Sequence, residues 1–207
     1  MGASELAPSA KPVLLLDVMD TIVYDPFFQD MPVHFGMSFK ELLAQKHPSA
    51  WLEFECGDID EDQLFAKFFA DGRRVDGGAL KDMLVSKYRW LPGMEPLLAR
   101  LVAAGYRLHA CSNYPTWYRL IEAKLAPSRY LSWTFVSCEG AMKGHRKPAR
   151  EAYEACIEEL QLQPADLIFV DDRKVNVEGA RAAGMHGILF EGADALEQEL
   201  LRKGLSF

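Results

Sequence analysis

The chain contains 207 residues, of which 49% are hydrophobic and 26% are charged, and its 30 acidic and 23 basic side chains give a formal net charge of −7. This hydrophobic content excludes a disordered chain, and the lack of an apolar run of about 18 residues excludes a membrane-spanning helix. The length predicts one domain, with or without an insertion. The acidic balance argues against nucleic-acid and membrane partners, although it leaves room for a local basic pocket that holds one phosphate.

The amino terminus and the cysteines carry little functional information. Residues 1–11 are mostly small or polar, which predicts a flexible N-terminal segment. Neither a signal-peptide core nor an Arg/Ser-rich transit peptide is recognisable there, and since such segments can be trimmed from a chain, this says little about the organelle. The cysteines are widely spaced without a Cys-x-x-Cys pair, which predicts buried thiols in a reducing compartment. They are Cys56, Cys111, Cys138 and Cys156.

Short apolar runs alternate with helical patterns through most of the chain. The apolar runs predict buried parallel strands, and they lie at 13–17, 106–111, 133–137, 167–170 and 187–190. The helical patterns lie at 94–104, 115–125, 150–160, 176–183 and 196–201. This alternation predicts an α/β fold with a doubly wound parallel sheet.

The segment 24–90 interrupts this alternation, because it carries helical signals and no convincing strand. A capping box that starts at Ser38 predicts one helix, Asp60 opens a second, and a third helical pattern covers 79–88. These signals predict a small helical cap domain inserted after the first strand. The expected division is a cap domain at 24–90 and a core domain that comprises 12–23 and 91–207.

Polar side chains follow the predicted strands at the edge where the carboxyl ends of parallel strands meet. Asp17 follows the first strand, Ser112 follows the second, and Asp171 and Asp172 follow the fourth, while Lys147 precedes the helix between the third and fourth strands. A single Asp after a strand is more often a turn or capping residue, but in a parallel sheet these positions converge. Carboxylates can hold a divalent cation or attack phosphorus, and a lysine and a hydroxyl can hold phosphate oxygens.

At these positions the chain resembles the haloacid dehalogenase superfamily of aspartate-nucleophile hydrolases, specifically members with a small helical cap. The matching motifs lie at 16–21, 109–113, 144–148 and 169–172 with Asn176. The resemblance implies that Asp17 is the nucleophile that forms an aspartyl-phosphate, and that Ser112 and Lys147 hold the phosphoryl group. It also implies Mg²⁺ beside Asp17, bound by the backbone carbonyl of Met19 and by Asp172, with Asp171 as the second candidate ligand.

The chain departs from the family pattern at Met19, where phosphatases of the superfamily have a second Asp that acts as general acid. The neighbouring acidic residue is Asp20, our candidate acid or base. Metal binding does not depend on this side chain, because the implied ligand is a backbone carbonyl. General acid catalysis contributes on the order of 10²–10⁴-fold, so we expect a slow phosphatase unless Asp20, His145 or a metal-ordered water donates the proton.

The missing acid leaves two alternatives open. One is a low-activity protein of binding or regulatory function that keeps the fold and the metal site. The other is a 2-haloacid dehalogenase, which attacks carbon and needs neither a general acid nor a metal. The adjacent carboxylates of Asp171 and Asp172 oppose the dehalogenase reading, because they would repel each other at a strand end without a cation.

Within the superfamily, the chain is similar to the plant and algal chloroplast FMN hydrolases, whose Met at position 19 it shares. The similarity lies in the patterns at 17–23, 25–27, 51–55 and 113–118. It implies Mg²⁺-dependent hydrolysis of FMN, a small phosphorylated metabolite, to riboflavin and phosphate. It also implies a chloroplast location, with the cytoplasm as the alternative, and we expect a monomer or a homodimer.

Aromatic residues gather in the predicted cap, where ten of the 23 aromatics lie within 24–69. Most of them have helical spacing and are expected in the core of the cap, but a flat isoalloxazine ring would also pack well against aromatic faces. The residues that first follow the nucleophile strand are the better candidates for substrate contact, together with those beside Ser112. These expected substrate-binding residues are Tyr24, Phe27, Phe28, His34, Asn113 and Tyr114.

Overall fold

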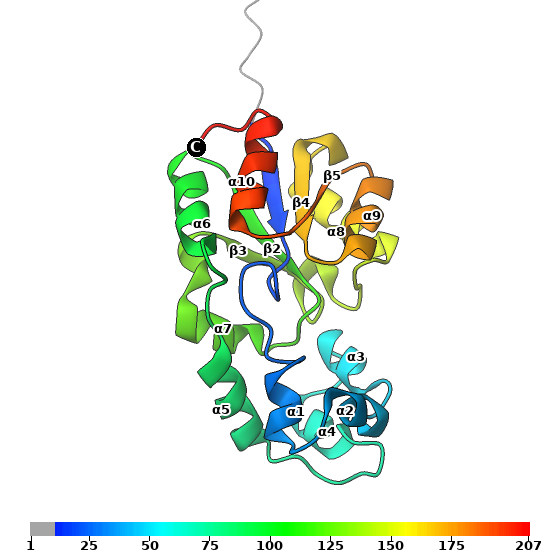
Figure 1. Ribbon diagram of the computed structural model, residues 1–207. Helices are drawn as coiled ribbons and strands as arrows, with labels where there is room; N and C mark the ends of the chain where they lie inside the picture. Colours follow the sequence, from blue (N-terminus) through cyan, green and yellow to red (C-terminus); the bar gives the residue numbers. More distant parts are fainter. Residues whose placement is uncertain (1–10) are drawn as a thin grey trace, which may run out of the picture.

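The computed structural model describes residues 11–207, so all but the last residue of the expected flexible segment lies outside the described residues. Figure 1 shows two lobes. The upper lobe contains a β-sheet with helices on both faces, and the lower lobe is entirely helical. The chain passes into the lower lobe after the first strand and returns to complete the sheet.

All five strands of the upper lobe are parallel and have the order β3-β2-β1-β4-β5. This sheet confirms the predicted α/β fold, and its order places β1, the strand that precedes Asp17, in the centre. The strands are β1 (Val13–Leu16), β2 (Leu108–Ser112), β3 (Ser132–Val136), β4 (Leu167–Asp171) and β5 (His186–Leu189).

The helices of the upper lobe cover both faces of the sheet. They are α6 (Met94–Ala103), α7 (Tyr118–Leu125), α8 (Arg150–Leu160), α9 (Lys174–Ala182) and α10 (Ala193–Arg202). Leu14 and Leu16 of β1 pack in the core that contains side chains of α6, α7 and α10, whereas Val13 and Leu15 pack in the core of α8 and α9. A strand covered on both faces needs apolar side chains at every position, which is why β1 shows no polar alternation.

The lower lobe consists of five helices, α1 (Asp30–His34), α2 (Phe39–Gln45), α3 (Ala50–Glu55), α4 (Glu61–Lys67) and α5 (Gly77–Lys87). Complete capping boxes start α2 at Ser38 and α4 at Asp60, as predicted. The helices α1 and α3 were not predicted, because five or six residues are too few to show a helical period. Short 3-10 helices in the upper lobe cover Pro127–Arg129, Gly140–Met142 and Pro164–Asp166.

The segments that enter and leave the lower lobe run side by side. The N–H of Tyr24 donates to the carbonyl of Arg89 at 3.0 Å, and the N–H of Leu91 donates to the carbonyl of Ile22 at 2.9 Å. Both contacts lie at the predicted boundaries, although the division into domains stays a prediction. The hydrophobic core continues across the junction, where Trp117 packs against aromatic rings of α3 and α4.

None of the helices formed by residues 11–207 combines the length and the apolar character that crossing a membrane requires. The four cysteines are free thiols. Cys111, Cys138 and Cys156 are buried, as predicted, whereas Cys56 is half-buried.

Candidate active site

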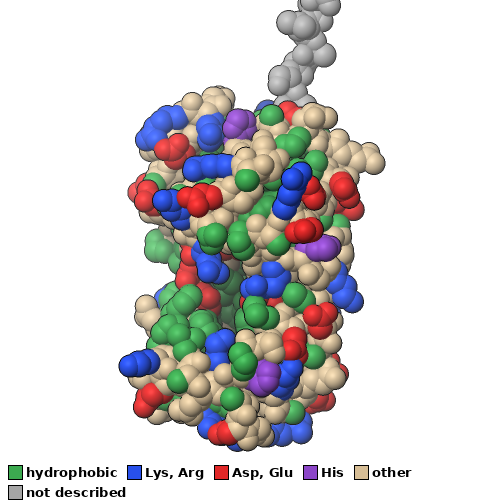
Figure 2. Space-filling model, turned by 90° about the vertical axis from the view of Figure 1, so that its right-hand side faces the viewer, with side chains coloured by type: hydrophobic (Ala, Val, Ile, Leu, Met, Phe, Trp, Pro, Cys, Tyr) green, Lys and Arg blue, Asp and Glu red, His purple; other side chains and the backbone are tan. Residues whose placement is uncertain are grey.

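A cavity of about 380 Å³ lies between the carboxyl ends of the strands and the lower lobe. Figure 2 shows a hollow between the two lobes, where acidic, basic and hydrophobic side chains meet. The cavity lining includes most of the residues that the sequence predicted for the site. These are Asp17, Met19, Asp20, Phe27, Phe28, Ser112, Asn113, Tyr114, Lys147 and Asp172.

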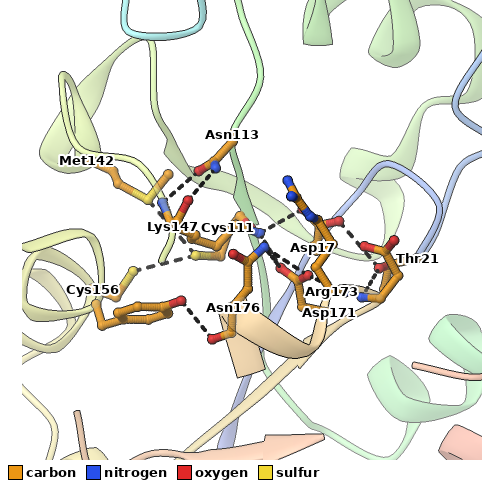
Figure 3. Close-up of polar contacts among 12 residues, drawn as sticks. Asp17, Thr21, Cys111, Asn113, Met142, Lys147, Cys156, Asp171, Arg173 and Asn176 are labelled. Atoms are coloured by element: carbon orange, nitrogen blue, oxygen red, sulfur yellow. Dashed lines mark hydrogen bonds and ion pairs between the residues drawn. The ribbon is translucent and has the colours of Figure 1, made fainter. Parts of the chain in front are cut away.

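The ammonium of Lys147 is the centre of the polar network at the strand ends (Figure 3). Its Nζ donates to Asp17 Oδ1 at 2.7 Å, to Asp171 Oδ2 at 2.7 Å and to the carbonyl of Cys111 at 2.6 Å. Burial lowers the pKa of Lys147, but attraction to Asp17 and Asp171 outweighs burial and raises the pKa above its ordinary value. The side chain therefore carries a fixed positive charge beside Asp17.

The two carboxylates that follow β4 have different surroundings. Asp171 is completely buried and accepts hydrogen bonds from Lys147, from the backbone N–H of Arg173 at 2.8 Å and from Asn176 Nδ2, which lies 3.0 Å from both carboxylate oxygens. Asp172 is half-buried and lines the cavity. Asp171 thus holds Lys147 in place, and Asp172 keeps oxygens free for a cation.

Three carboxylates provide a site that suits a hard divalent cation. Ligand atoms of Asp17, Asp171 and Asp172 all lie within 4.8 Å of one another. Burial raises the pKa of Asp17 to about 7, and burial together with the charge of Asp171 raises the pKa of Asp172 to about 6. One lysine cannot balance three carboxylates, so the oxygen donor set and the charge excess both fit Mg²⁺.

Ser112 carries a buried hydroxyl whose Oγ has no hydrogen-bond partner among residues 11–207. Buried polar atoms are nearly always satisfied, so an orphaned hydroxyl beside Lys147 fits a site for a phosphate oxygen. The neighbouring Asn113 is engaged differently. Its Nδ2 donates to the carbonyl of Lys147 at 2.8 Å, and its Oδ1 accepts from the N–H of Lys147 at 2.9 Å. Asn113 therefore fixes the backbone of Lys147, and its contact with substrate stays a prediction.

The loop after Asp17 brings two further carboxyl groups to the cavity. Asp20 has a left-handed backbone with φ of 54°, and its Oδ1 accepts from the N–H of Asp25 at 2.9 Å. Burial raises the pKa of Asp20, and burial raises the pKa of Asp25 to about 7. Both groups therefore hold a proton more readily than an ordinary carboxyl group. His145, the other expected proton donor, is exposed and does not line this cavity.

Two of the expected substrate-binding residues are not brought to the cavity. Tyr24 donates its hydroxyl to Asp30 at 2.8 Å, and the guanidinium of Arg89 lies 3.6 Å from the centre of its ring. His34 ends α1 and packs edge-on against Phe35. Neither side chain is part of the cavity lining. These two residues were predicted because they follow the first strand in the sequence, but sequence position does not show which way a side chain faces.

An ion pair that sequence reasoning missed joins the two lobes at the cavity. Glu55 of α3 is buried, and its Oε2 accepts a hydrogen bond from Arg146 Nε at 2.8 Å and forms an ion pair with Arg146 Nη2 at 2.6 Å. Trp51 donates its indole N–H to the other oxygen of Glu55. Lys46, which directly follows α2, also lines the cavity. Arg146 precedes Lys147 in the third motif, which is the one sequence signal that pointed to this contact.

Comparisons with known proteins agree with this geometry. A family model described as haloacid dehalogenase-like hydrolase matches residues 18–184. The flavin mononucleotide hydrolase 1 of Arabidopsis thaliana, a chloroplast protein by its name, is 50% identical over 195 residues, which cover 94% of this chain and 78% of the relative. The sesquiterpene phosphatase astK of Aspergillus oryzae is 27% identical over 163 residues, which cover 73% of this chain and 78% of the relative.

Solved structures of distant relatives share the fold. A haloacid dehalogenase family enzyme of Bacteroides thetaiotaomicron, in complex with magnesium and inorganic phosphate, has a TM-score of 0.66 at 21% identity and covers 87% of this chain and 94% of its own. A hydrolase of the same type from Porphyromonas gingivalis has a TM-score of 0.72 at 16% identity, covering 96% of this chain and 100% of its own. The chain belongs to the haloacid dehalogenase-like hydrolases.

Proposed function

We propose that this chain is a Mg²⁺-dependent phosphatase that hydrolyses FMN to riboflavin and phosphate. The observation that carries the proposal is the contact of Lys147 with Asp17, beside the unpartnered hydroxyl of Ser112. The 50% identity to the FMN hydrolase of Arabidopsis thaliana supports FMN as the substrate and the chloroplast as the location. Residues 24–90 would form the cap that selects the substrate, and 12–23 with 91–207 would form the core that carries the chemistry.

Asp17 is the nucleophile in this proposal. Its Oδ1 is held by Lys147, whereas among residues 11–207 Oδ2 has only a long 3.4 Å contact with the hydroxyl of Thr21, which makes Oδ2 the freer oxygen. Attack of this oxygen on phosphorus breaks the bond between phosphorus and the ribityl oxygen and forms an aspartyl-phosphate. Water then hydrolyses the aspartyl-phosphate, which releases phosphate and restores the carboxylate.

Charge neutralisation is the main requirement, because Asp17 and the substrate phosphate are both negative. Lys147 and the hydroxyl of Ser112 would hold phosphate oxygens during transfer. Mg²⁺, held by Asp17, Asp172 and the backbone carbonyl of Met19, would supply further positive charge. Asp171, the second candidate ligand, already accepts from Lys147, Arg173 and Asn176 and would instead position Lys147. The relative from Bacteroides thetaiotaomicron binds magnesium and inorganic phosphate, which supports this assignment at the level of the fold.

The leaving ribityl oxygen needs a proton, and the side chain of Met19 cannot supply one. Asp20 is our first candidate for the general acid, because it lines the cavity and burial raises its pKa. Asp25 lines the same cavity and has a pKa raised to about 7 by burial, so it is the second carboxyl group that can carry the proton near neutral pH.

The test is the hydrolysis of FMN by the purified chain with Mg²⁺ and with EDTA. We expect riboflavin and phosphate to appear in equal amounts with Mg²⁺ and neither with EDTA. FMN that binds without turnover would instead indicate the binding or regulatory protein. Release of halide from 2-chloropropionate in EDTA would indicate a dehalogenase.

A further inference from the structure

Lys46, which follows α2 in the lower lobe, lines the same cavity as the phosphate-binding residues of the proposed site. We propose that Lys46 determines substrate specificity by donating a hydrogen bond to a carbonyl-bearing edge of a flat aromatic leaving group. This proposal rests on the proposed function and deepens it, because it assigns the residue that distinguishes the isoalloxazine of FMN from other phosphate esters.

The ammonium of Lys46 has no hydrogen bond and no ion pair within residues 11–207, whereas the other partly buried lysines of the lower lobe are paired. Lys67 pairs with Glu53 at 2.5 Å, and Lys81 pairs with Glu61 at 2.7 Å. Lys46 is half-buried, and this burial lowers its pKa. A partly desolvated ammonium that has no acceptor of its own is suited to bind an acceptor from a ligand.

Glu55, the carboxylate whose charge acts on Lys46, is already paired with Arg146. One carboxylate oxygen of Glu55 accepts a hydrogen bond from Arg146 Nε and forms an ion pair with Arg146 Nη2, and the other accepts a hydrogen bond from Trp51. Among residues 11–207, the positive charge of Lys46 is therefore not neutralised by an ion pair.

Aromatic rings form a wall beside this charge. Phe27 and Trp51 are nearly parallel, with an angle of 29° between the ring planes and 6.4 Å between the ring centres, and Lys46 Nζ lies 5.8 Å from the centre of Phe27. Phe28 and Leu43 also line the cavity, and they are 52% and 45% exposed, respectively. Neighbouring apolar side chains that stay exposed in a polar cavity are typical of a binding surface.

This arrangement matches the isoalloxazine ring in two respects. The ring is flat and largely apolar, so aromatic and aliphatic side chains can cover its faces. Its pyrimidine edge carries two carbonyl oxygens, which are acceptors for an ammonium group. A phosphate held by Lys147 on the core side and a carbonyl held by Lys46 on the cap side would fix both ends of one molecule in one cavity.

The test compares Lys46→Met with Lys46→Arg and with Lys40→Met. Lys40 is an exposed residue of α2 outside the cavity, which makes it the matched control. KM and kcat are measured with FMN and with phenyl phosphate, which lacks carbonyl groups, and riboflavin affinity is measured by fluorescence quenching. A lost charge-assisted hydrogen bond predicts that Lys46→Met raises KM for FMN and weakens riboflavin binding by about ten-fold or more.

The proposal further requires that kcat for FMN and kcat/KM for phenyl phosphate stay unchanged in Lys46→Met. Lys46→Arg should retain part of the affinity for riboflavin. Lys40→Met should resemble the unmodified chain in every measurement. Unchanged KM and riboflavin affinity in Lys46→Met would overturn the proposal, as would an equal loss with both substrates. If the unmodified chain releases no phosphate from FMN, the proposed function fails, and riboflavin affinity still decides the role of Lys46.

Discussion

The carboxylate of Asp171 lies 2.7 Å from the ammonium of Lys147, and both side chains are fully excluded from solvent. Asn176 and the N–H of Arg173 occupy the remaining acceptor positions of this carboxylate. Asp171 is therefore a positioning residue that holds Lys147 against Asp17. The pair is possible at this depth only because each charge has several partners.

Replacing Asp171 by Asn should destabilise the fold. Removing one partner of a buried ion pair costs about 3–5 kcal/mol, and we expect about 3 kcal/mol because Asp17 still pairs with Lys147. Urea unfolding measures this cost. The control is Asp166→Asn, an exposed position directly before β4, which should leave stability unchanged. Equal stability of the two variants would show that the buried pair has no structural role.

Stabilisation by Mg²⁺ should depend on pH. The pKa of Asp17 is raised by burial from 3.8 to about 7, so between these values the folded state binds a proton more readily than the unfolded state. The stability that Asp17 contributes to the metal-free protein is therefore lost as the pH rises from about 4 to about 7. Mg²⁺ binds ionised carboxylates, so it competes with the proton on Asp17. The same competition applies at Asp172, whose pKa is about 6.

Thermal unfolding at acidic and at mildly alkaline pH, with Mg²⁺ and with EDTA, checks this expectation. Mg²⁺ should raise the unfolding temperature more at the alkaline pH. An equal effect at both pH values, or none at either, would contradict the assignment of the carboxylates to metal binding.

The ion pair between Glu55 and Arg146 should couple the lower lobe to the upper lobe. A double-mutant cycle with Glu55→Gln and Arg146→Met should give a coupling energy of about 1–3 kcal/mol, because Glu55 is buried and tightly held. The same cycle at the exposed pair Arg150 and Glu154 should give less than about 0.5 kcal/mol. Similar energies at the two pairs would mean that the contact between the lobes contributes little.

Asp20→Asn should remove proton donation by this residue while it keeps the conformation of the loop. Asn tolerates the left-handed backbone and keeps an oxygen for the N–H of Asp25, so the loop should be preserved. We expect kcat for FMN to fall by about 10²–10⁴-fold, and kcat for p-nitrophenyl phosphate to fall far less, since its leaving group needs no proton. If Asp25→Asn gives this pattern and Asp20→Asn does not, Asp25 is the acid.

The sheet and the convergence of the expected site residues could be predicted because their signals are local. Each strand is a short apolar run, and Asp17, Ser112 and Asp172 follow such runs directly. A parallel sheet then brings these positions together without further information. The strand order β3-β2-β1-β4-β5 was not predicted, but the convergence of the motifs requires only that the strands are parallel.

The cap side of the cavity could not be predicted in the same way. Glu55 and Arg146 are 91 positions apart, and no local pattern links them. The helix α1 has only five residues, so its sequence does not show that His34 faces away from the cavity. Tyr24 precedes α1 and Lys46 follows α2, so no helical period indicates which of them lines the cavity. Orientation within a short helical cap depends on tertiary packing, which sequence periodicity does not encode.

The most direct test of the account is the rate of FMN hydrolysis by Asp17→Asn, measured with saturating Mg²⁺ beside the unmodified chain. Asn keeps the shape of Asp17 but cannot attack phosphorus, so we predict a loss of at least about 10³-fold in kcat while the variant stays folded. Hydrolysis by Asp17→Asn at a rate near that of the unmodified chain would contradict the assignment of Asp17 as the nucleophile.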